Sequence, residues 1–537
     1  MKNKPSLLRL TLQIAVLISA VFALYAQSLS SLPFFDDPDF NTLLENGRKH
    51  FNFSLRWLPL ATLGWTISWL GEDVFWLRLG NVSLHIGNVL ALFFLLRELF
   101  YVTLADGQDD YKARVSLGWF AFFGALIFAL HPVAVYGVGY LVQRSILMAT
   151  LFVLLMLIAY LRGLVRGGWY WMVIASLCYF VAVYAKEHSI AAPLVALALT
   201  FLIRKPSLGL LKQISLYFVL CTLIAASVIY ITNKMGLIAN TYEPNGAGII
   251  EFTLKKQGAA VSSGENNYLL SILTQSGLFF KYLGLWLIPN PAWMSVDMRE
   301  PFAISFWSGS YLFGLLGFLA YPCVAIWLLI QRGRYGLLGF ALLFPWLMFL
   351  TEMATVRGQE TFVLYRSYLW MSGLYIALPV LCAGLAPKRA YLLLGVLAVL
   401  LVPLSLNRLH SLSSSLLLWD DAEKLVRDKH HMFGVERIYF NRGHELAQLG
   451  RYEEAIKDFS TAITIYPGYD ITYCDRATAE YMLGQYQAAL SDYNRALAIN
   501  PENPICYMGR GLTHNSLGSY QAAEADFASS CALGICR

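Results

Sequence analysis

The sequence is divided into long apolar runs, many of them close to the roughly 20 residues that an α-helix needs to cross the hydrocarbon of a bilayer. Only 14% of the residues are charged, against roughly a quarter in a soluble globular protein. The first run, from Thr11 to about Leu29, follows three cations and shows no obvious signal-peptide cleavage site. We therefore expect an all-α polytopic membrane protein that retains its first span.

Eleven runs are expected to cross the membrane, and one further run is ambiguous. The eleven are residues 11–29, 79–99, 117–136, 145–164, 169–185, 188–203, 214–233, 306–330, 336–353, 368–386 and 390–407. Residues 268–291 are also long enough, but they contain Gln275 and Lys281. If this run does not cross, the cation clusters of the connections all fall on the side of the amino terminus, as the positive-inside rule requires. These clusters are Lys112/Arg114, Arg162/Arg166, Arg204/Lys205/Lys212, Arg332/Arg334 and Lys388/Arg389.

The positive-inside rule thus favours eleven spans, a cytoplasmic amino terminus and a carboxyl terminus on the opposite side. We expect residues 268–291 to be re-entrant or interfacial. Two polar stretches, 30–78 and 234–305, would then lie on the outer side of the membrane. Within the first of them, the tryptophan-rich residues 55–71 are typical of a helix that lies in the membrane interface.

A repeat of 34 residues follows the change, from Trp419 onward, to the composition of a soluble helical domain. The residues that recur in step are Arg442/Arg476/Arg510, Gly450/Gly484/Gly518, Tyr452/Tyr486/Tyr520, Ala455/Ala489/Ala523 and Asp458/Asp492/Asp526. This period is the signature of the tetratricopeptide repeat, a helix pair with Gly at its turn and Pro after its second helix. We expect residues 1–410 to form the membrane domain, 411–435 a linker helix and 436–537 an α-solenoid of three repeats.

The eight cysteines divide evenly between the two parts of the chain. Four lie in apolar spans, where a thiol packs as a small core residue. The other four, Cys474, Cys506, Cys531 and Cys536, lie in the repeat domain. A short disulfide between Cys531 and Cys536 would form if the compartment is oxidising, and the sequence leaves this open. No cysteine cluster has a convincing zinc spacing, and the sequence demands no metal.

Polar residues gather on the expected outer connections. Asp36 and Asp37 follow the first span directly and are the candidate catalytic pair. Arg144, Lys186 and Arg366 oppose the positive-inside trend and need an anionic partner, which a phosphate held at the membrane surface would supply. The candidates for binding a substrate or a lipid phosphate are His131, Gln143, Arg144, Lys186, Glu187, Tyr365 and Arg366.

A simpler reading assigns these residues to structure alone. His131 would then only end a helix, Arg144 would reach lipid headgroups, and Lys186 and Glu187 would neutralise each other. We favour a site because an acid pair and three cations lie on one side of the membrane. Such a site would hold a lipid phosphate and abstract or steer a proton.

A multi-span chain with an acidic pair in its first outer loop resembles the GT-C superfamily, glycosyltransferases that use lipid-phosphosugars. Six motifs follow one another as in the transmembrane-and-tetratricopeptide-repeat protein O-mannosyltransferases and their bacterial relatives. They are FFDDPDFN, LRWLPL, SLHIGNVL, HPVAVYGVGYLVQRSILMATLF, AKEHSIAAPL and VLYRSYLWMSGL. The resemblance covers nearly the whole chain. Gln143-Arg144 stands where relatives often have Gly-Arg, and Leu58 follows Trp57 where Arg-Pro is common, so the sugar and the acceptor stay open.

The resemblance implies a GT-C-like membrane domain, in a bacterial inner membrane, with the repeats in the periplasm. The donor would be a sugar on a polyprenyl phosphate or diphosphate, and the acceptor a hydroxyl of a secreted or envelope protein that the repeats engage. Asp36 or Asp37 would act as the general base, and Arg144, Lys186 and Arg366 would hold the departing phosphate. No cofactor beyond the lipid-linked donor is implied. The scattered cations do not suggest nucleic acid as a partner.

Two other functions compete with this one. An oligosaccharide ligase or polymerase that acts on a lipid diphosphate would also suit outer arginines and appended repeats. A non-catalytic scaffold would use the repeats to assemble an envelope machine. Replacement of the acid pair separates the scaffold from the enzymes, because a folded scaffold should tolerate it.

Overall fold

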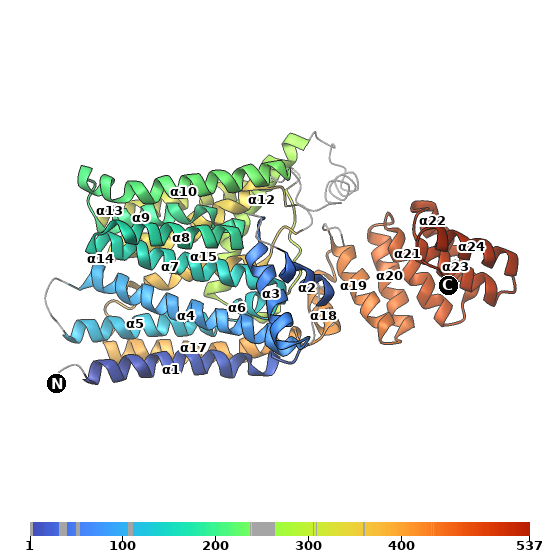
Figure 1. The fold of residues 1–537 in the computed structure, drawn as a ribbon, viewed down its shortest axis with the longest axis horizontal. Coiled ribbons are helices and arrows are strands. Elements are labelled where there is room, and N and C mark those ends of the chain that lie inside the picture. The colour runs from blue at the N-terminus through green and yellow to red at the C-terminus, as the bar shows by residue number, and fades with distance from the viewer. Residues whose placement is uncertain are drawn as a thin grey trace.

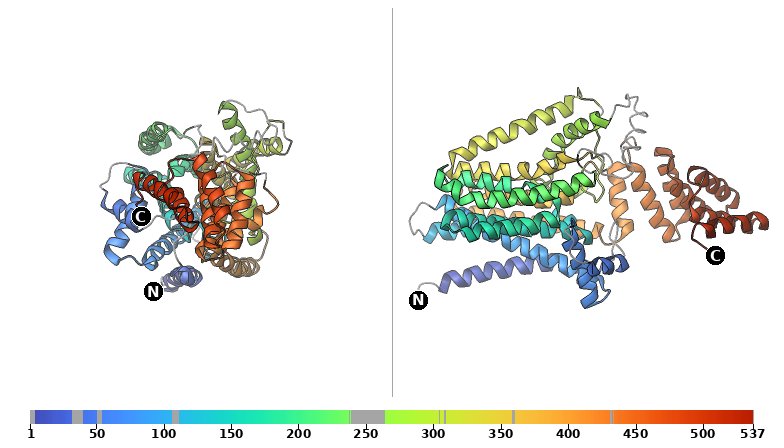
Figure 2. Two further views of the ribbon diagram at one scale, coloured as in Figure 1. Left: turned by 90° about the vertical axis from the view of Figure 1, so that its right-hand side faces the viewer. Right: turned by 45° about the horizontal axis from the view of Figure 1, so that its top comes forward.

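The chain folds into a bundle of long helices that continues into a stack of shorter ones (Figure 1). The computed structural model describes residues 4–31, 40–49, 54–105, 111–236, 238, 264–303, 305–307, 309–357, 360–430, 432 and 434–536. The amino terminus lies at the free end of the bundle and the carboxyl terminus in the stack at the opposite end of the molecule (Figures 1 and 2).

The bundle is built from the apolar runs of the sequence. Its long helices are α1 (Lys4–Tyr25), α4 (Val74–Leu104), α5 (Tyr111–Ala129), α7 (Arg144–Arg166), α8 (Trp169–Ala185), α9 (Ala192–Ile203), α10 (Leu208–Lys234), α12 (Gly264–Leu287), α13 (Gly309–Gln331), α14 (Gly333–Phe349) and α17 (Pro387–Ser411). Among the described residues, seven helical stretches are long and apolar enough to cross a membrane, and three more apolar helices are shorter. The chain is therefore an integral membrane protein. Helix α12 packs along α13 and is not one of the seven, and the prediction that residues 268–291 do not cross stays a prediction.

The expected span at residues 368–386 is not a continuous helix. It consists of η6 (Leu364–Arg366), α15 (Ser367–Met371), η7 (Ser372–Ala377) and α16 (Leu378–Leu381). Pro379 supplies no backbone N–H, and the hydroxyls of Ser367 and Ser372 bond to carbonyls of the preceding turn, so regular helix is interrupted. The irregular backbone of residues 367–377 is tolerated because most of these residues are buried in the protein.

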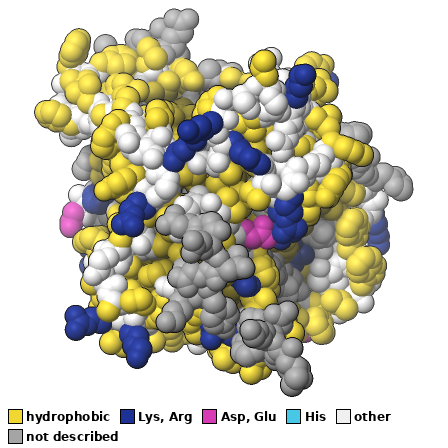
Figure 3. All heavy atoms as spheres, turned by 90° about the vertical axis from the view of Figure 1, so that its left-hand side faces the viewer, with side chains coloured by type: hydrophobic (Ala, Val, Ile, Leu, Met, Phe, Trp, Pro, Cys, Tyr) yellow, Lys and Arg dark blue, Asp and Glu magenta, His cyan; other side chains and the backbone are white. Residues whose placement is uncertain are grey.

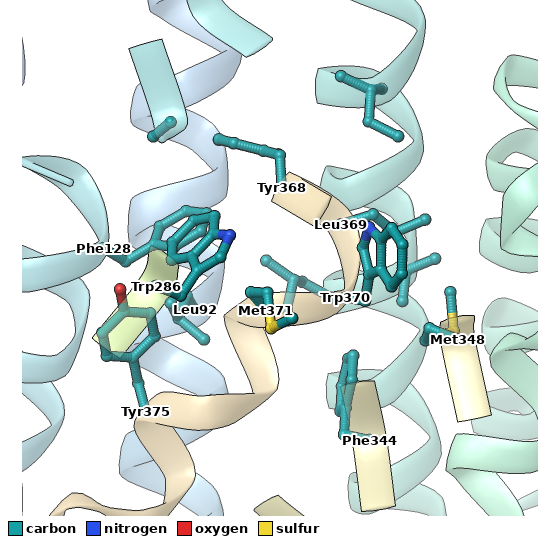
Figure 4. Packing of buried hydrophobic residues seen from close by; sticks show 14 of the residues in the cluster. Leu92, Phe128, Trp286, Phe344, Met348, Tyr368, Leu369, Trp370, Met371 and Tyr375 are labelled. Carbon is teal, nitrogen blue, oxygen red and sulfur yellow. The ribbon is translucent and has the colours of Figure 1, made fainter. Parts of the chain in front are cut away.

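Buried aromatic residues hold the broken segment in place (Figure 4). Trp286 of α12 donates its indole N–H to the hydroxyl of Ser367, at 2.9 Å. The Trp286 ring lies parallel to Phe128, with ring centroids 6.0 Å apart, and the ring of Trp370 lies 4.8 Å from that of Phe349. The start of this segment, which carries Arg366, is thereby fixed by the core.

Two short helices lie at the end of the bundle that faces the stack (Figure 1). These are α2 (Phe40–Arg48) and α3 (Trp57–Leu70), and α3 is the tryptophan-rich helix expected at the membrane interface. They touch backbone to backbone at Gly47 and Gly64, where a Cβ on Gly64 would lie 2.5 Å from the Gly47 nitrogen. Trp69 is 76% exposed, as suits a side chain that contacts lipid headgroups.

The stack is a repeat of helix pairs. After α18 (Ser415–Val426), the pairs are α19 (Val435–Gln448) with α20 (Tyr452–Ile465), α21 (Asp470–Met482) with α22 (Tyr486–Ile499), and α23 (Pro504–Ser516) with α24 (Tyr520–Ala532). The turn of each pair contains a glycine with φ near +75°, a conformation that is unfavourable for residues with a Cβ. These glycines are Gly450, Gly484 and Gly518. Each pair also carries an arginine–aspartate bridge: Arg442–Asp458, Arg476–Asp492 and Arg510–Asp526. The period of 34 therefore corresponds to one stacked unit.

Two disulfides lie in the stack. Cys474 of α21 is bonded to Cys506 of α23, which joins successive repeats. Cys531 is bonded to Cys536 at the end of the last helix, which resolves the possibility that the sequence left open. The Cys474–Cys506 pairing had no signal in the sequence, because its partners are brought together only by the stacking of the repeats.

Candidate active site at the outer end of the bundle

A polar cavity of about 230 Å³ lies where several connections of the membrane domain meet. Its walls come from the residues before and in α3, the start of α7, the connection after α8, and the residues that lead into η6. The lining residues are Arg56, Leu60, Tyr140, Val142, Gln143, Ser145, Lys186, His188, Arg357, Glu360, Tyr365 and Arg366. Four predicted site residues, Gln143, Lys186, Tyr365 and Arg366, are among them.

Lys186 is a buried cation in the wall of this cavity. Its side chain follows the last turn of α8, and the residue is only 5% exposed. Among the residues that the structure describes, its ammonium group makes no hydrogen bond and no ion pair. Burial and the positive charge of Arg56 lower the pKa of Lys186 to about 7, with smaller contributions from Arg366 and Arg357, and the negative charge of Glu187 opposes this shift. A buried ammonium without a partner is costly, so an anionic ligand in the cavity would be strongly favoured.

Glu187, the acid next to Lys186 in the sequence, forms an ion pair with Arg56. Arg56 forms a two-pronged ion pair with Glu187, with its Nε 3.0 Å from Oε2. The backbone N–H of Arg56 also donates to the carbonyl of Tyr184, at 2.8 Å, which fixes the residue over the end of α8. Glu187 therefore forms its ion pair with Arg56 and not with Lys186. Arg56 was not among the predicted site residues, because nothing in the sequence relates it to a residue 131 positions away.

Arg366 is held between two carboxylates. Its Nη1 lies 3.1 Å from Glu352, and its Nη2 lies 3.4 Å from Glu360. Glu352 is 1% exposed and also lies 2.9 Å from Nε2 of His188. Sequence reasoning missed Glu352, although a lone acid at the end of an apolar run is a signal that could have found it.

Gln143 and Tyr365 complete the polar wall. The side-chain oxygen of Gln143 is buried and has no hydrogen-bond partner among the described residues. The ring of Tyr365 meets that of Tyr140 edge to face, with centroids 6.1 Å apart, and lies under the guanidinium of Arg366. Both side chains are therefore held where a ligand in the cavity would meet them.

Arg144 and His131 lie outside this cavity. The guanidinium of Arg144 donates to Oδ1 of Asn81 at 2.9 Å and to the carbonyl of Leu77 at 2.7 Å. His131 stacks on Trp286, with ring centroids 4.3 Å apart, and its Nε2 is 3.1 Å from the Trp286 carbonyl. Both side chains are buried and form hydrogen bonds within the core, so neither lines the cavity around Lys186.

The acid pair Asp36 and Asp37 lies outside the described residues. Ser31, a few residues before it, is bonded to a side chain that also contacts the cavity wall. Arg78 of α4 donates to the carbonyl of Ser31 and to that of Gly139, both at 2.7 Å. Gly139 precedes Tyr140, which lines the cavity. One arginine thus ties the end of the first membrane helix to the cavity wall.

A second, apolar pocket adjoins the polar one. It has a volume of about 160 Å³ and shares His188 and Arg357 with the polar cavity. Its other lining residues are Glu187, Ile190, Val228, Ile229, Thr232, Ile238, Thr351, Ala354 and Thr355. Ile229 of α10 is 50% exposed, so the pocket opens on the apolar side of the bundle.

The opposite end of the bundle is basic. Arg332 donates to the carbonyl of Arg204 at 2.7 Å, and Arg204 donates to that of Leu164 at 2.8 Å. Three connections that carry predicted cation clusters are thereby brought side by side. Figure 3 shows this face, over which lysine and arginine side chains are spread and few acidic ones are seen.

Sequence profiles identify the stack. A profile described as tetratricopeptide repeat matches residues 436–469, and a second, described as TPR repeat, matches residues 477–518. Similar solved structures include the first TPR of Spaghetti (RPAP3) bound to an HSP90 peptide, at 25% identity, and the Arabidopsis OM64 TPR domain, at 26%. Each match covers 18% of this chain, covers 79% and 82% of the other chain respectively, and has a TM-score of 0.18.

One solved structure aligns with most of the chain. It is ArnT from Cupriavidus metallidurans bound to undecaprenyl phosphate, at 14% identity over 90% of this chain and 79% of that one, with a TM-score of 0.36. No curated protein sequence matches the chain. The chain is an all-α integral membrane protein that ends in tetratricopeptide repeats.

Proposed function

We propose that the protein is a GT-C-type membrane glycosyltransferase. It transfers a sugar from a polyprenyl-phosphate-linked donor to a hydroxyl of a secreted or envelope protein, on the outer face of the membrane. The observation that carries this proposal is Lys186, a buried cation that makes no hydrogen bond or ion pair with a described residue, in a polar cavity that adjoins an apolar pocket. The phosphate of a lipid would occupy the polar cavity, and the first part of its chain the apolar one.

The charges around the cavity suit an anionic lipid phosphate. The charged side chains that line it or pair directly with those that do are five cations, Arg56, Lys186, Arg357, Arg366 and Arg437, and three carboxylates, Glu187, Glu352 and Glu360. Two positive charges remain when His188 is neutral. This excess suits a sugar phosphodiester, which carries one negative charge, and a diphosphate donor, which carries two.

The proposed reaction is a direct displacement at the anomeric carbon. A carboxylate of Asp36 or Asp37 removes the proton of the acceptor hydroxyl as its oxygen bonds to the sugar. The bond from the sugar to the phosphate oxygen breaks, and Lys186 and Arg366 stabilise the charge that grows on the departing lipid phosphate. One displacement inverts the anomeric centre.

Charge and the disulfides support the proposed orientation. The basic end of the bundle would face the cytoplasm, in accord with the positive-inside rule. The cavity and the repeats would then lie outside, where Cys474–Cys506 and Cys531–Cys536 can persist in an oxidising compartment. In a bacterium this compartment is the periplasm. The repeats, whose family binds polypeptides, would engage the acceptor protein.

Glycan mass spectrometry of the secreted proteins tests the proposal in the producing cell. Cells with the wild-type chain should carry hydroxyl-linked glycans that are absent from cells with Asp36→Asn and Asp37→Asn together. Loss of general-base catalysis predicts a fall of about a hundredfold or more. Unchanged glycans in the double variant would overturn the assignment of the base and favour a scaffold, while loss of lipid-linked polymer in place of protein glycans would favour the ligase.

A further inference from the structure

The first helix of the repeat domain reaches the wall of the cavity. Arg437, in the first turn of α19, lies 3.3 Å from one oxygen of Glu360. The other oxygen of Glu360 lies 3.4 Å from Arg366. Glu360 and Arg366 both line the cavity. A single carboxylate thus connects the repeat domain to the proposed phosphate site.

The same part of the wall is packed against the repeat domain. Val356 belongs to a small apolar cluster, against which Tyr469 of the repeat domain packs, and the next residue, Arg357, lines the cavity. Val435 and Ile438 of α19 are fully buried and belong to the main apolar core of the molecule. The first repeat is therefore docked on the segment that carries the cavity residues, and its position bears on theirs.

The effect of the contact between Arg437 and Glu360 depends on whether Glu360 is ionised. Burial alone would raise the pKa of Glu360, but the guanidinium groups of Arg366 and Arg437 lower it below its ordinary value, so the side chain is ionised at neutral pH. While Arg437 is docked, it offsets one negative charge at the edge of the cavity. Without it, the surroundings of Glu360 would carry one positive charge fewer, and a phosphate next to Arg366 would be attracted less strongly.

We propose that Arg437 is a positioning residue that couples the repeat domain to the phosphate site through Glu360. A polypeptide that binds the repeats and shifts α19 changes the affinity of the cavity for a lipid phosphate. Because such coupling is reciprocal, an occupied cavity changes the affinity of the repeats for the polypeptide. This inference rests on the proposed function and deepens it, since it makes the repeats a regulator of donor binding as well as a docking surface.

Binding of undecaprenyl phosphate to the full chain in lipid nanodiscs tests the coupling. Arg437→Gln should weaken binding by roughly five- to thirtyfold, within the range usual for coupled sites. Glu360→Gln should strengthen it, and the double variant should return close to the wild-type affinity because it removes one charge of each sign. Arg451→Gln is the matched control, since Arg451 pairs with Glu454 in the same repeat at the surface, and it should have no effect.

A structural role without coupling gives different results. A loss in Arg437→Gln that Glu360→Gln does not restore, or an equal loss in Arg451→Gln, would overturn the coupling. The pH dependence of Lys186 labelling in lipid-free protein is a second measurement: its pKa should rise in Arg437→Gln and fall in Glu360→Gln. If the wild type binds no undecaprenyl phosphate, the proposed function fails, and unchanged Lys186 titration in both variants would overturn the coupling independently.

Discussion

Lys186 and Arg144 have the same standing in the sequence, since each is a cation on an expected outer connection, yet the structure gives them opposite roles. The guanidinium of Arg144 donates hydrogen bonds to Asn81 and to the carbonyl of Leu77. Lys186 lines the cavity. The difference depends on partners that are distant in the chain, so no local pattern could reveal it.

This difference predicts opposite effects of glutamine at the two sites. Arg144→Gln should lower the free energy of unfolding, by about 1–3 kcal/mol for each buried acceptor left without its donor. Lys186→Gln should leave stability unchanged or raise it, because no bond is lost, and should abolish binding of undecaprenyl phosphate. Thermal unfolding and lipid binding in detergent, measured on both variants, separate the two roles; a stability loss in Lys186→Gln comparable to that in Arg144→Gln would contradict them.

The lowered pKa of Lys186 predicts a pH dependence of lipid binding. The ammonium is protonated below pH 7 and loses its charge as the pH rises through about 7. A phosphate monoester has its second pKa near 6, so the lipid itself changes little above pH 7.5. The affinity of the wild type for undecaprenyl phosphate should therefore fall between pH 7.5 and 9. A wild-type affinity that stays constant across this range would exclude Lys186 as the titrating group.

The sequence predicted the helices of the repeat domain, but it did not predict that the segment from η6 to α16 is broken. The 34-residue period located all three helix pairs and their turn glycines. The apolar run at 368–386 reads as a span because hydropathy does not register Pro379 or the serine hydroxyls that bond to the backbone. Arg366 is the last residue of η6, near the start of the broken segment, and lines the cavity.

The repeat helices carry a pH-sensitive acid. Glu480 of α21 is nearly buried, and burial together with the charge of Asp492 raises its pKa to about 7. A raised carboxyl pKa contributes stability that is present below the unfolded value and lost as the pH rises through about 7. Hydrogen exchange of the α21 and α22 amides should therefore be slower at pH 5.5 than at pH 8 after correction for the intrinsic rate. Glu480→Gln should remove this difference, and an undiminished difference would assign it to another group.

At the scale of the whole molecule, the sequence predicted a membrane domain followed by outer repeats, and the structure agrees on the two parts. It also shows what the sequence could not, namely that the first repeat is docked on the cavity wall. We expect a reporter that is active only after export, fused after Arg537, to be active. A signal restricted to a cytoplasmic reporter at the same position would overturn both the orientation and the outer location of the cavity.

Photo-crosslinking tests whether the polar cavity and its apolar neighbour together bind a lipid phosphate. Undecaprenyl phosphate with a photoreactive group in its first isoprene units should label the apolar pocket, at Val228, Ile229 or Thr351. Lys186→Gln should abolish the labelling. Lys281→Gln should not, because Lys281 is paired with Glu300 away from this cavity. Labelling spread evenly over the lipid-facing helices, or labelling of the apolar pocket that persists in Lys186→Gln, would show that the two pockets do not bind a lipid phosphate together.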